Sequence, residues 1–289
     1  MELSNRLQAV ADLLDCHDRV ADIGCDHGFV SIYLIESKKA SKCLAMDVNK
    51  GPLERAREHV IEKRLSTYIE TRLSDGAKAI EFLTGEDGKS KLEVEAALIA
   101  GMGGRLTIQI IKDSLDKFKC MEEFVLQPQS EISKVRQFVR EIGYHIEKEN
   151  MILEDGKFYP MMKVVCGKKE INYAERIPKS IEKSLEEGEL NVSDIQWLFD
   201  EYGEWLLKEK NQILLYFLQK EKSLYSDILE NLEKTDTLKS ELRQKEIHFR
   251  FWIIDIYIIN RNCNIVILIR CSLIDTERVC FFFYLFISC

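Results

Sequence analysis

Two of the most apolar stretches of the chain each contain an aspartate, and the first of these stretches ends in a glycine. The runs Val20–Gly24 and Cys43–Val48 carry Asp22 and Asp47, respectively. A glycine at position 24 lets the backbone turn tightly and approach a ligand. Asp22 is placed to organise that turn and to hold a cationic amino group through water. Asp47 suits the ribose of an adenosine, because one carboxylate accepts hydrogen bonds from both hydroxyls. These residues predict an adenosine-containing cofactor.

The spacing of the glycines decides which adenosine cofactor fits. A dinucleotide site uses three glycines, GxGxxG, so that a helix N-terminus meets a pyrophosphate. Here the glycines are Gly24 and Gly28, and Asp26 lies between them. A carboxylate in this loop would repel a pyrophosphate but attract the sulfonium and ammonium groups of S-adenosylmethionine. S-adenosylmethionine is therefore the predicted cofactor, and a nicotinamide dehydrogenase is disfavoured. An ordinary turn that binds no cofactor is the simpler alternative.

Two later loops fit the same site. Asp75 and Gly76 follow the weak strand signal Tyr68–Leu73, where a carboxylate could accept a hydrogen bond from the adenine 6-amino group. Asp-Gly is also a common turn pair, so a plain turn is the alternative. The loop Gly101–Gly104 follows the apolar run Ala96–Met102 and precedes a helical stretch. Ligands of a doubly wound sheet lie beyond the carboxyl ends of its strands, so this loop should border the methyl donor.

Apolar runs alternate with helical patterns from residue 20 to about 167, which predicts parallel βαβ units and an α/β fold. The expected strands are Val20–Gly24, Cys43–Val48, Tyr68–Leu73, Ala96–Met102 and Phe124–Gln127, with helices at Pro52–Arg64, Arg105–Phe118 and Glu131–Glu141. No helical pattern separates Tyr144–Met151 from Tyr159–Cys166, and the turn signal Glu154-Asp155-Gly156 lies between them. This predicts an antiparallel hairpin that closes the sheet.

The chain changes character after residue 169. Ile177–Leu185 and Val192–Lys210 are expected to be helices, and residues 213–242 to form a helical hairpin or short coiled coil. Residues 247–289 hold four of the nine cysteines together with apolar runs. The polar interruptions and the short second run argue against a membrane span. A frameshift near residue 245 is an alternative origin of this tail. The predicted domains are 1–169, 170–246 and 247–289.

Composition sets the class of protein. The 289 residues are 46% hydrophobic and 31% charged, as in a soluble globular protein, and the net charge is −8. The cysteines have neither CxxC pairs nor metal-ligand spacing, so no metal is predicted. Met1–Leu14 has the pattern of an amphipathic helix and not of a signal segment, which favours a reduced, cytoplasmic protein. A nucleic-acid substrate would need a local basic face, because the overall charge is acidic.

Several motifs occur together in one order and carry a family resemblance. They are Ser4-Asn5-Arg6-Leu7, Ala21-Asp22-Ile23-Gly24, Asp26-His27-Gly28, Asn49-Lys50-Gly51-Pro52-Leu53, Ala100-Gly101-Met102-Gly103-Gly104, Leu126-Gln127-Pro128 and Glu154-Asp155-Gly156-Lys157-Phe158-Tyr159. The combination resembles the bacterial tRNA (adenine(22)-N1)-methyltransferase family, often called TrmK, over roughly residues 1–167. The chain departs from the family after His27, where Gly28-Phe29-Val30-Ser31 replaces a small residue followed by Leu and Pro.

The resemblance implies a class I, Rossmann-like methyltransferase with a mostly parallel seven-stranded sheet and a C-terminal α-helical domain. It implies S-adenosylmethionine as donor and N1 of an adenine in the tRNA D-arm as acceptor. Carried over to this chain, the donor pocket would be lined by Asp22, Gly24, Asp26 and His27, with Asp47 at the ribose, Asp75 and Gly76 at the adenine ring, and Gly101, Met102 and Gly103 beside the methionine moiety and target base.

Methylation at adenine N1 requires alignment more than proton removal, because N1 has an in-plane lone pair. Four residues are assigned to this step: Asp26 to stabilise the cationic product ring, His27 to position the base or take up a proton, Met102 beside the reacting groups, and Gln127 to bond the base edge. Arg6 is expected to meet a tRNA phosphate and Tyr159 to stack on the base. For His27 a backbone-bonded helix residue is an alternative, and for Arg6 a solvated charge.

These inferences predict tRNA as the partner, a monomer without a stable protein partner, and no membrane association. Two other functions stay open on sequence grounds. The first is a methyltransferase that acts on a protein or small molecule, as the net charge of −8 would suit. The second is a non-catalytic adenosine-binding scaffold whose helical arm recruits a partner. This scaffold would bind the cofactor without turnover.

Overall fold

A computed structural model of the chain describes residues 3–85, 88–166, 192–232 and 237–262. Its centre is a seven-stranded sheet in the order β3-β2-β1-β6-β7-β9-β8. Five strands are parallel: β1 (His17–Ile23), β2 (Ala40–Asp47), β3 (Ile69–Leu73), β6 (Ala96–Met102) and β7 (Glu123–Pro128). The antiparallel hairpin of β8 (His145–Glu154) and β9 (Lys157–Val165) completes the sheet, and β9 pairs with β7. The predicted α/β fold with a mostly parallel seven-stranded sheet is confirmed.

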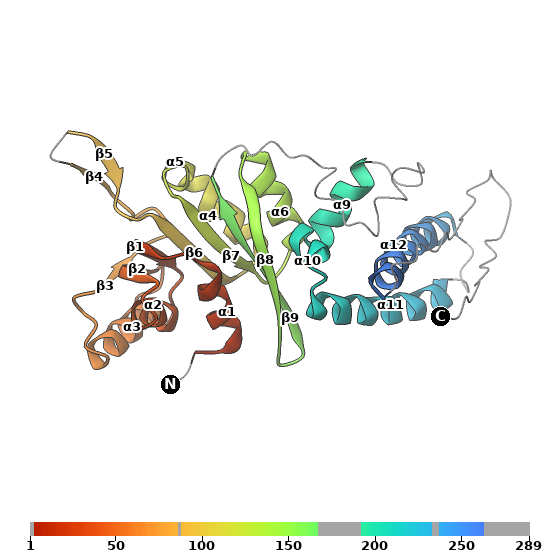
Figure 1. Cartoon of the computed structure of the whole chain (residues 1–289), viewed down its shortest axis with the longest axis horizontal. Helices are drawn as coiled ribbons and strands as arrows, with labels where there is room; N and C mark the ends of the chain where they lie inside the picture. The colour runs from red at the N-terminus through yellow and green to blue at the C-terminus, as the bar shows by residue number, and fades with distance from the viewer. Residues whose placement is uncertain (1–2, 86–87, 167–191, 233–236, 263–289) are drawn as a thin grey trace.

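Helices cover both faces of the sheet because its strands alternate buried side chains between two apolar clusters (Figure 1). Val20 faces one cluster and Ala21 the other. The first face carries α1 (Asn5–Leu13), α2 (Phe29–Glu36) and α3 (Lys50–Glu62), and the second carries α4 (Gly104–Asp113), α5 (Leu115–Phe118) and α6 (Ile132–Glu141). Ser4 caps α1, since its Oγ accepts a hydrogen bond from the amide of Leu7.

A two-stranded ribbon projects from one end of the molecule and was not predicted (Figure 1). It consists of β4 (Phe82–Thr84) and β5 (Ser90–Leu92), which pair antiparallel. Its strands are only three residues long and mostly exposed. Such short strands have no apolar alternation, which explains why the sequence pattern did not reveal them.

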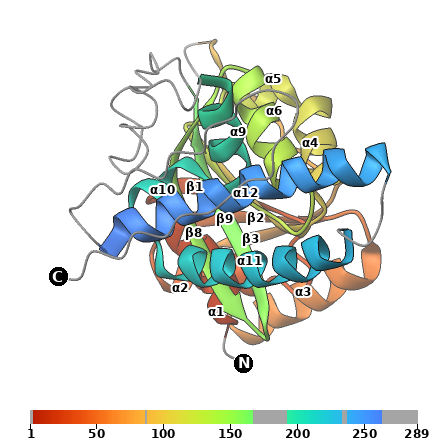
Figure 2. The same ribbon diagram turned by 90° about the vertical axis from the view of Figure 1, so that its right-hand side faces the viewer.

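The C-terminal helices form a third apolar cluster at the opposite end. They are α9 (Val192–Tyr202), α10 (Glu204–Lys208), α11 (Gln212–Leu232) and α12 (Leu238–Asn262). Figure 2 shows α11 and α12 lying side by side across this end as a helical hairpin. The hairpin is longer than the one expected over residues 213–242, most of which lie in α11 alone, and its second arm continues to Asn262. The helix expected over Val192–Lys210 is divided at Gly203, whose φ of +92° interrupts it. The helix expected at Ile177–Leu185 lies outside the described residues.

Helix α12 continues without a break across residue 247, where the predicted tail begins. Ile247 and Ile254 are both fully buried in the third cluster. The predicted domain boundaries and the frameshift near residue 245 stay predictions. Within the described part of the chain, none of the helices has both the length and the apolar character that a membrane crossing requires.

A buried ion pair joins the helical end to the sheet. Arg136 of α6 contacts Glu149 of β8 at 2.8 Å, and both side chains are almost fully buried. Arg136 also donates to the carbonyls of Asp200 and Glu201 at the end of α9. Glu149 accepts from the amide of Trp205 in α10 at 3.0 Å. Because each charge is paired and hydrogen-bonded, the pair holds the two parts in a specific arrangement.

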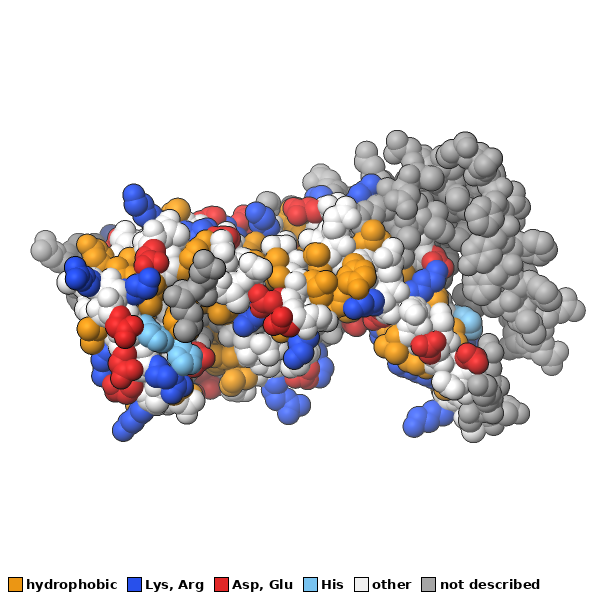
Figure 3. Space-filling view, turned by 90° about the horizontal axis from the view of Figure 1, so that it is seen from below, with side chains coloured by type: hydrophobic (Ala, Val, Ile, Leu, Met, Phe, Trp, Pro, Cys, Tyr) orange, Lys and Arg blue, Asp and Glu red, His pale blue; other side chains and the backbone are white. Residues whose placement is uncertain are grey.

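Charge is distributed without a single dominant sign on the face seen in Figure 3. Basic and acidic side chains are interspersed there, with apolar side chains between them. This agrees with the acidic net charge of −8. On this face, therefore, the fold presents no broad basic field of the kind that binds nucleic acid through charge alone.

Candidate functional site

A cavity of about 440 Å³ opens at the carboxyl ends of β1, β2, β3 and β6. This is where ligands bind in doubly wound sheets, and the volume is that of a small-molecule site. Most of the predicted cofactor residues line it: Asp22, Gly24, Asp26, His27, Asp47, Asp75, Gly76, Gly101 and Met102. Gly103 lies behind them as the residue preceding α4, with extended backbone. The fold thus brings together residues that are up to 80 positions apart in sequence.

Gly24 and Met102 both line this cavity and lie against each other. Gly24 has a φ of +81°, and a Cβ added to it would lie 2.1 Å from the Met102 methyl carbon. The amides of Gly24 and Cys25 both donate to the carbonyl of Met46 at 2.8 Å, which ties the turn to the end of β2. Only glycine therefore combines this backbone conformation with the close approach of Met102.

Asp22 is buried without a cationic partner among the described residues. Its side chain accepts a hydrogen bond from Ser31 Oγ at 2.6 Å, and the residue is 5% exposed. Burial raises the pKa of Asp22 to about 6, and the charge of Asp47 adds to this effect while Ser31 opposes it. A buried carboxylate of this kind is poorly compensated until a positive group approaches. Its environment therefore favours a cationic ligand.

Asp47 and Asp26 face the cavity in different ways. Asp47 is 8% exposed, and its two oxygens accept from the amides of Asp26 at 3.3 Å and Asn49 at 2.8 Å. These bonds aim the carboxylate while leaving acceptor capacity, since each oxygen has two lone-pair sites. Asp26 has a φ of +46° and an exposed side chain that lies 3.7 Å from His27 Nε2 and 3.9 Å from Arg55. Asp26 is thus at the mouth, and Asp47 is in the wall.

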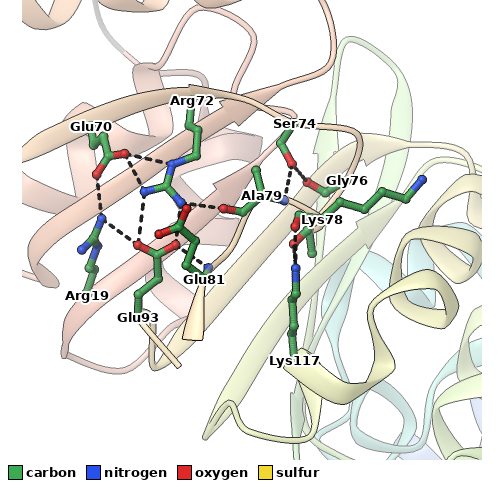
Figure 4. Close-up of polar contacts among 11 residues, drawn as sticks. Arg19, Glu70, Arg72, Ser74, Gly76, Lys78, Ala79, Glu81, Glu93 and Lys117 are labelled. Carbon is green, nitrogen blue, oxygen red and sulfur yellow. Dashed lines mark hydrogen bonds and ion pairs between the residues drawn. The ribbon is translucent and has the colours of Figure 1, made fainter. Parts of the chain in front are cut away.

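The loop that carries Asp75 and Gly76 is held from behind, as Figure 4 shows. Ser74 Oγ donates to the carbonyl of Gly76 at 2.7 Å and accepts from the amide of Ala79 at 3.1 Å. Lys117 Nζ donates to the carbonyls of Ala77 and Lys78. The Asp75 carboxylate is paired with Lys78. The position of the loop is therefore set by α5 and by its own turn.

An ion-pair network lies under the same loop (Figure 4). Glu93 is buried and pairs with Arg72, whose guanidinium also donates to the carbonyl of Ala79 at 2.6 Å. Arg19 reaches the same carboxylate at 3.2 Å. Arg72 is the penultimate residue of β3, just before the loop begins, and Ala79 lies further along the same loop. The network therefore ties both the start and the later part of the loop to the sheet.

Apolar side chains border the cavity beside this loop. Gly76 has a φ of +62° and packs closely on α4, since a Cβ there would lie 3.0 Å from two carbons of Ile110. Val48 and Leu106 also line the cavity and are 58% and 52% exposed. Apolar side chains beside a carboxylate suit a purine ring with an amino group.

The other end of the cavity is organised by Arg6. Its Nη1 donates to Gln127 Oε1 at 2.7 Å, and its guanidinium lies 5.1 Å from the centre of the Tyr159 ring. Glu154 accepts from the Arg6 amide at 3.2 Å. Gln127 Oε1 also accepts from the amide of Gly101 at 3.2 Å. Arg6 therefore links α1, the β8–β9 hairpin and the glycine loop, and it lines the cavity as well.

The structure places the remaining predicted residues less directly. Gln127 is fully buried behind the wall and does not line the cavity, and neither does Tyr159. His27 lines it and stacks on Phe29, with ring centres 5.6 Å apart. The backbone carbonyl of His27 contacts His59 Nδ1 at 2.9 Å. Its imidazole is therefore held at the mouth by ring stacking and by a fixed backbone.

Sequence reasoning did not assign several cavity residues to the site, among them Leu106, Ile110 and Gln129. The apolar ones have no motif, because an exposed leucine on a helix reads as an ordinary surface position. Gln129 had a usable signal: it directly follows Leu126-Gln127-Pro128, and ligands bind beyond the carboxyl ends of parallel strands. That position could have directed attention to it.

S-adenosylmethionine fits these residues. Four carboxylates line the cavity, from Asp22, Asp26, Asp47 and Asp75, against the single arginine Arg6. This excess of negative charge matches a ligand with sulfonium and ammonium groups and would repel a pyrophosphate. Asp47 is available to the ribose hydroxyls, and the apolar side chains beside Gly76 are available to the adenine ring. The missing side chain of Gly24 leaves room for the Met102 methyl group in the wall.

Comparisons with known proteins agree with this geometry. A family profile described as "Methyltransferase domain" matches residues 3–162. A protein of Bacillus subtilis (strain 168) named "tRNA (adenine(22)-N(1))-methyltransferase" is 30% identical over 251 residues, which cover 86% of this chain and 93% of that protein. The crystal structure of the B. subtilis M1A22 tRNA methyltransferase TrmK is 27% identical with a TM-score of 0.67, and the match covers 89% of this chain and 99% of that one. Streptococcus pneumoniae Sp1610, solved in complex with S-adenosyl-L-methionine, is 25% identical with a TM-score of 0.67 and the same coverage.

Proposed function

The chain belongs to the bacterial tRNA (adenine(22)-N1)-methyltransferase family, and from this premise we propose that it methylates N1 of adenine 22 in the D-arm of tRNA. S-adenosylmethionine supplies the methyl group when it is bound. The observation that carries the proposal is the carboxylate-lined cavity at the carboxyl ends of the parallel strands, with Gly24 and Met102 in contact in its lining. The reaction is a transfer of one methyl group to a nitrogen lone pair.

The chain's own residues divide the work of binding and alignment. Asp47 holds the ribose hydroxyls, and Asp75 and Gly76 hold the adenine ring of the donor. Asp22 compensates the ammonium group from its buried position. Gly101, Met102 and Gly103 set the wall that separates donor and acceptor, because Gln127 fixes the amide of Gly101. Alignment of this kind converts an encounter into a unimolecular step and accounts for most of the required acceleration.

Residues at the mouth act on the acceptor side. N1 of adenine attacks through its lone pair, the bond from methyl to sulfur breaks, and the ring becomes cationic. Asp26 is the nearest exposed carboxylate of the mouth and stabilises that charge. His27, held by its stack with Phe29, positions the base. Arg6 and Tyr159 are assigned to the tRNA, as a pair in which the ring supports the guanidinium.

Other parts of the proposal follow from the substrate. A tRNA-modifying activity places the protein in the cytoplasm, where its cysteines stay reduced. The protein acts as a monomer without a stable protein partner. The target adenine must leave its stack to reach the cavity, so the tRNA is opened locally on binding.

A direct assay tests the function. The purified full-length chain is incubated with labelled S-adenosylmethionine and a transcribed tRNA that carries adenine 22, and the methylated nucleoside is located by mass spectrometry and a reverse-transcription stop. One N1-methyladenosine at position 22 is expected, and none when guanine replaces that adenine. Methylation elsewhere, methylation of protein, or donor binding without any transfer would refute the proposal, and the last result would favour the scaffold alternative.

A further inference from the structure

Gln129 is a polar cavity residue that none of the sequence motifs contains and to which no role in binding or catalysis has been assigned above. It follows β7, its side chain is exposed, and it lines the cavity. Its backbone is fixed, since its amide donates to the carbonyl of Met102 at 2.8 Å. A Cβ built on Gly101 would lie 3.8 Å from Gln129 Nε2 and 3.9 Å from Arg6 Nη1. The side-chain amide therefore stands beside Gly101, next to the wall that separates donor and acceptor.

Gln127 cannot serve the base in the same way. It is fully buried, and its Oε1 already accepts from Arg6 and from Gly101. Its Nε2 donates to the carbonyl of Pro128 at 3.3 Å. Both ends of this amide are thus occupied inside the protein. Gln129 lies two residues further along, just past the end of β7 and at the surface, where its amide is accessible to a base.

The chemistry of a primary amide matches one edge of adenine. Glutamine presents one acceptor and two donors at a fixed separation, and it pairs with the N6 amino group and N7 of adenine. That edge adjoins N1 but does not include it, so N1 stays free to face the methyl group. Guanine offers an acceptor oxygen in place of the amino group and would leave the glutamine oxygen opposed to another oxygen.

On the basis of the proposed function, we propose that Gln129 recognises the target base: its Oε1 accepts a hydrogen bond from the N6 amino group, and its Nε2 donates one to N7. Arg6, on the other side of Gly101, closes this end of the cavity and limits how far the base can turn. The role of Gln129 is specificity and orientation, so its loss should affect the tRNA substrate and leave the donor site intact.

The test compares two substrates and two glutamine variants. tRNAs are ligated with adenine or 7-deazaadenine at position 22, and kcat/KM is measured for the wild-type chain, Gln129→Ala and Gln129→Glu. Gln129→Ala is expected to lower kcat/KM for adenine by about 10- to 100-fold, the loss of one bidentate contact. 7-Deazaadenine should cost the wild type about 10-fold and cost Gln129→Ala nothing further. Gln129→Glu should prefer 7-deazaadenine, because its carboxylate would face the N7 lone pair.

Two measurements serve as controls. The affinity for S-adenosylmethionine, measured by calorimetry, should change less than about twofold in both variants, which also reports that the site is folded. Gln109→Ala is the matched substitution, because Gln109 is an exposed glutamine of α4 whose amide bonds to Asp113 away from the cavity. It should retain wild-type kinetics on both substrates.

The result that overturns the inference is wild-type kcat/KM that is equal for adenine and 7-deazaadenine, or a Gln129→Ala variant as active as the wild type. Either outcome leaves methylation of adenine 22 in place, so it does not touch the proposed function. Failure of the proposed function is a different result, in which the wild-type chain does not methylate adenine 22 at all.

Discussion

The two edges of the sheet use acidic residues in opposite ways. At the carboxyl edge, Asp22 and Asp47 line the cavity and are held by a hydroxyl and by backbone amides, and no cationic side chain of the described residues pairs with either of them. At the amino edge, Glu123 at the start of β7 is equally buried but contacts Lys163 at 2.7 Å and His17 at 3.0 Å. Lys163 also reaches Asp15 and Glu147. At the amino edge, the protein itself supplies cations to the buried carboxylate. At the carboxyl edge, the buried carboxylates are left for a ligand to compensate.

The pKa shifts express this difference. Burial raises the pKa of Asp22 to about 6, because little opposes it. Burial also raises the pKa of Glu123, but the hydrogen bonds from His17 and Lys163 lower it by more. The pKa of Glu123 is therefore below its ordinary value. The pKa values of the two buried carboxyls therefore move in opposite directions, and the cationic partners of Glu123 account for the direction there. An unpaired buried carboxylate marks a site, while a paired one stabilises the fold.

The largest effect is expected at the amino edge. Lys163→Met removes the cation from a buried pair and leaves Glu123 with His17 and the amide of Asp15. The free energy of unfolding, measured by urea denaturation, should fall by about 3 kcal/mol. The affinity for S-adenosylmethionine should not change in the remaining folded protein, since the edge is remote from the cavity. A loss of stability below about 1 kcal/mol would show that the two edges are less different than their contacts imply.

Asp22→Asn should have the opposite effect on stability: it should stabilise the ligand-free fold. The raised pKa of Asp22 means that the uncharged form is favoured in the fold, so its stabilising contribution is complete below pH 3.8 and is lost as the pH rises through about 6. Asparagine stays neutral, so at pH 7 the ligand-free variant should be more stable than the wild type by about 2 kcal/mol. Thermal unfolding from pH 4 to pH 8 measures this. The variant should also bind the donor more weakly, and a destabilised variant would contradict the assignment.

Asp47→Asn tests the second open carboxylate. Asparagine keeps an acceptor oxygen for one backbone amide but loses the charge that strengthens both ribose hydrogen bonds. The donor affinity should fall by about tenfold, which corresponds to about 1.4 kcal/mol, with little change in stability. Calorimetric titration with S-adenosylmethionine gives the affinity. Unchanged affinity would mean that Asp47 serves only the loop amides of Asp26 and Asn49.

The smallest effect concerns His17. Its hydrogen bond to Glu123 raises its pKa, against the opposing effect of burial, and nearby glutamates add to the increase. The charged form therefore stabilises the fold below pH 6.5, and this contribution is lost as the pH rises through the raised pKa. His17→Gln should remove that slope, at a cost on the order of 1 kcal/mol at pH 6. Urea midpoints at pH 6 and pH 9 show whether the wild-type difference disappears.

Much of the fold could be predicted because its strands are long and apolar. Ala96–Met102 is found with the predicted bounds, and the parallel strands and closing hairpin lie where expected. The ribbon of β4 and β5 could not be predicted, because short exposed strands have no periodic signal. Gly203 interrupts a helical pattern at a point where a Cβ would lie 2.7 Å from the oxygens of Glu149. That reason is tertiary and is absent from the local sequence.

The candidate site shows the same division. Residue type and strand-end position were sufficient to identify Asp22, Asp47 and the loop at Gly101, because parallel strands bring their carboxyl ends to one edge. Gln127 and Gln129 look alike in sequence, and only packing shows that the first is enclosed while the second is exposed. Arg6 was expected to be a surface charge for tRNA, and its bond to Gln127 could not be foreseen, since the two residues lie 121 positions apart.

By itself, the sequence determined the fold class, the adenosine cofactor and the set of carboxylates that could hold it, because these depend on periodicity and on local chemistry. The tertiary structure alone decided which carboxylates are compensated. Asp22 of β1 and Glu123 of β7 are both buried acids of one sheet, yet Lys163 of the adjacent strand β9 pairs with Glu123, and none of the described cationic side chains pairs with Asp22. Both the burial and the pairing of a carboxylate depend on which residues the fold brings close to it, and the local sequence does not contain that information.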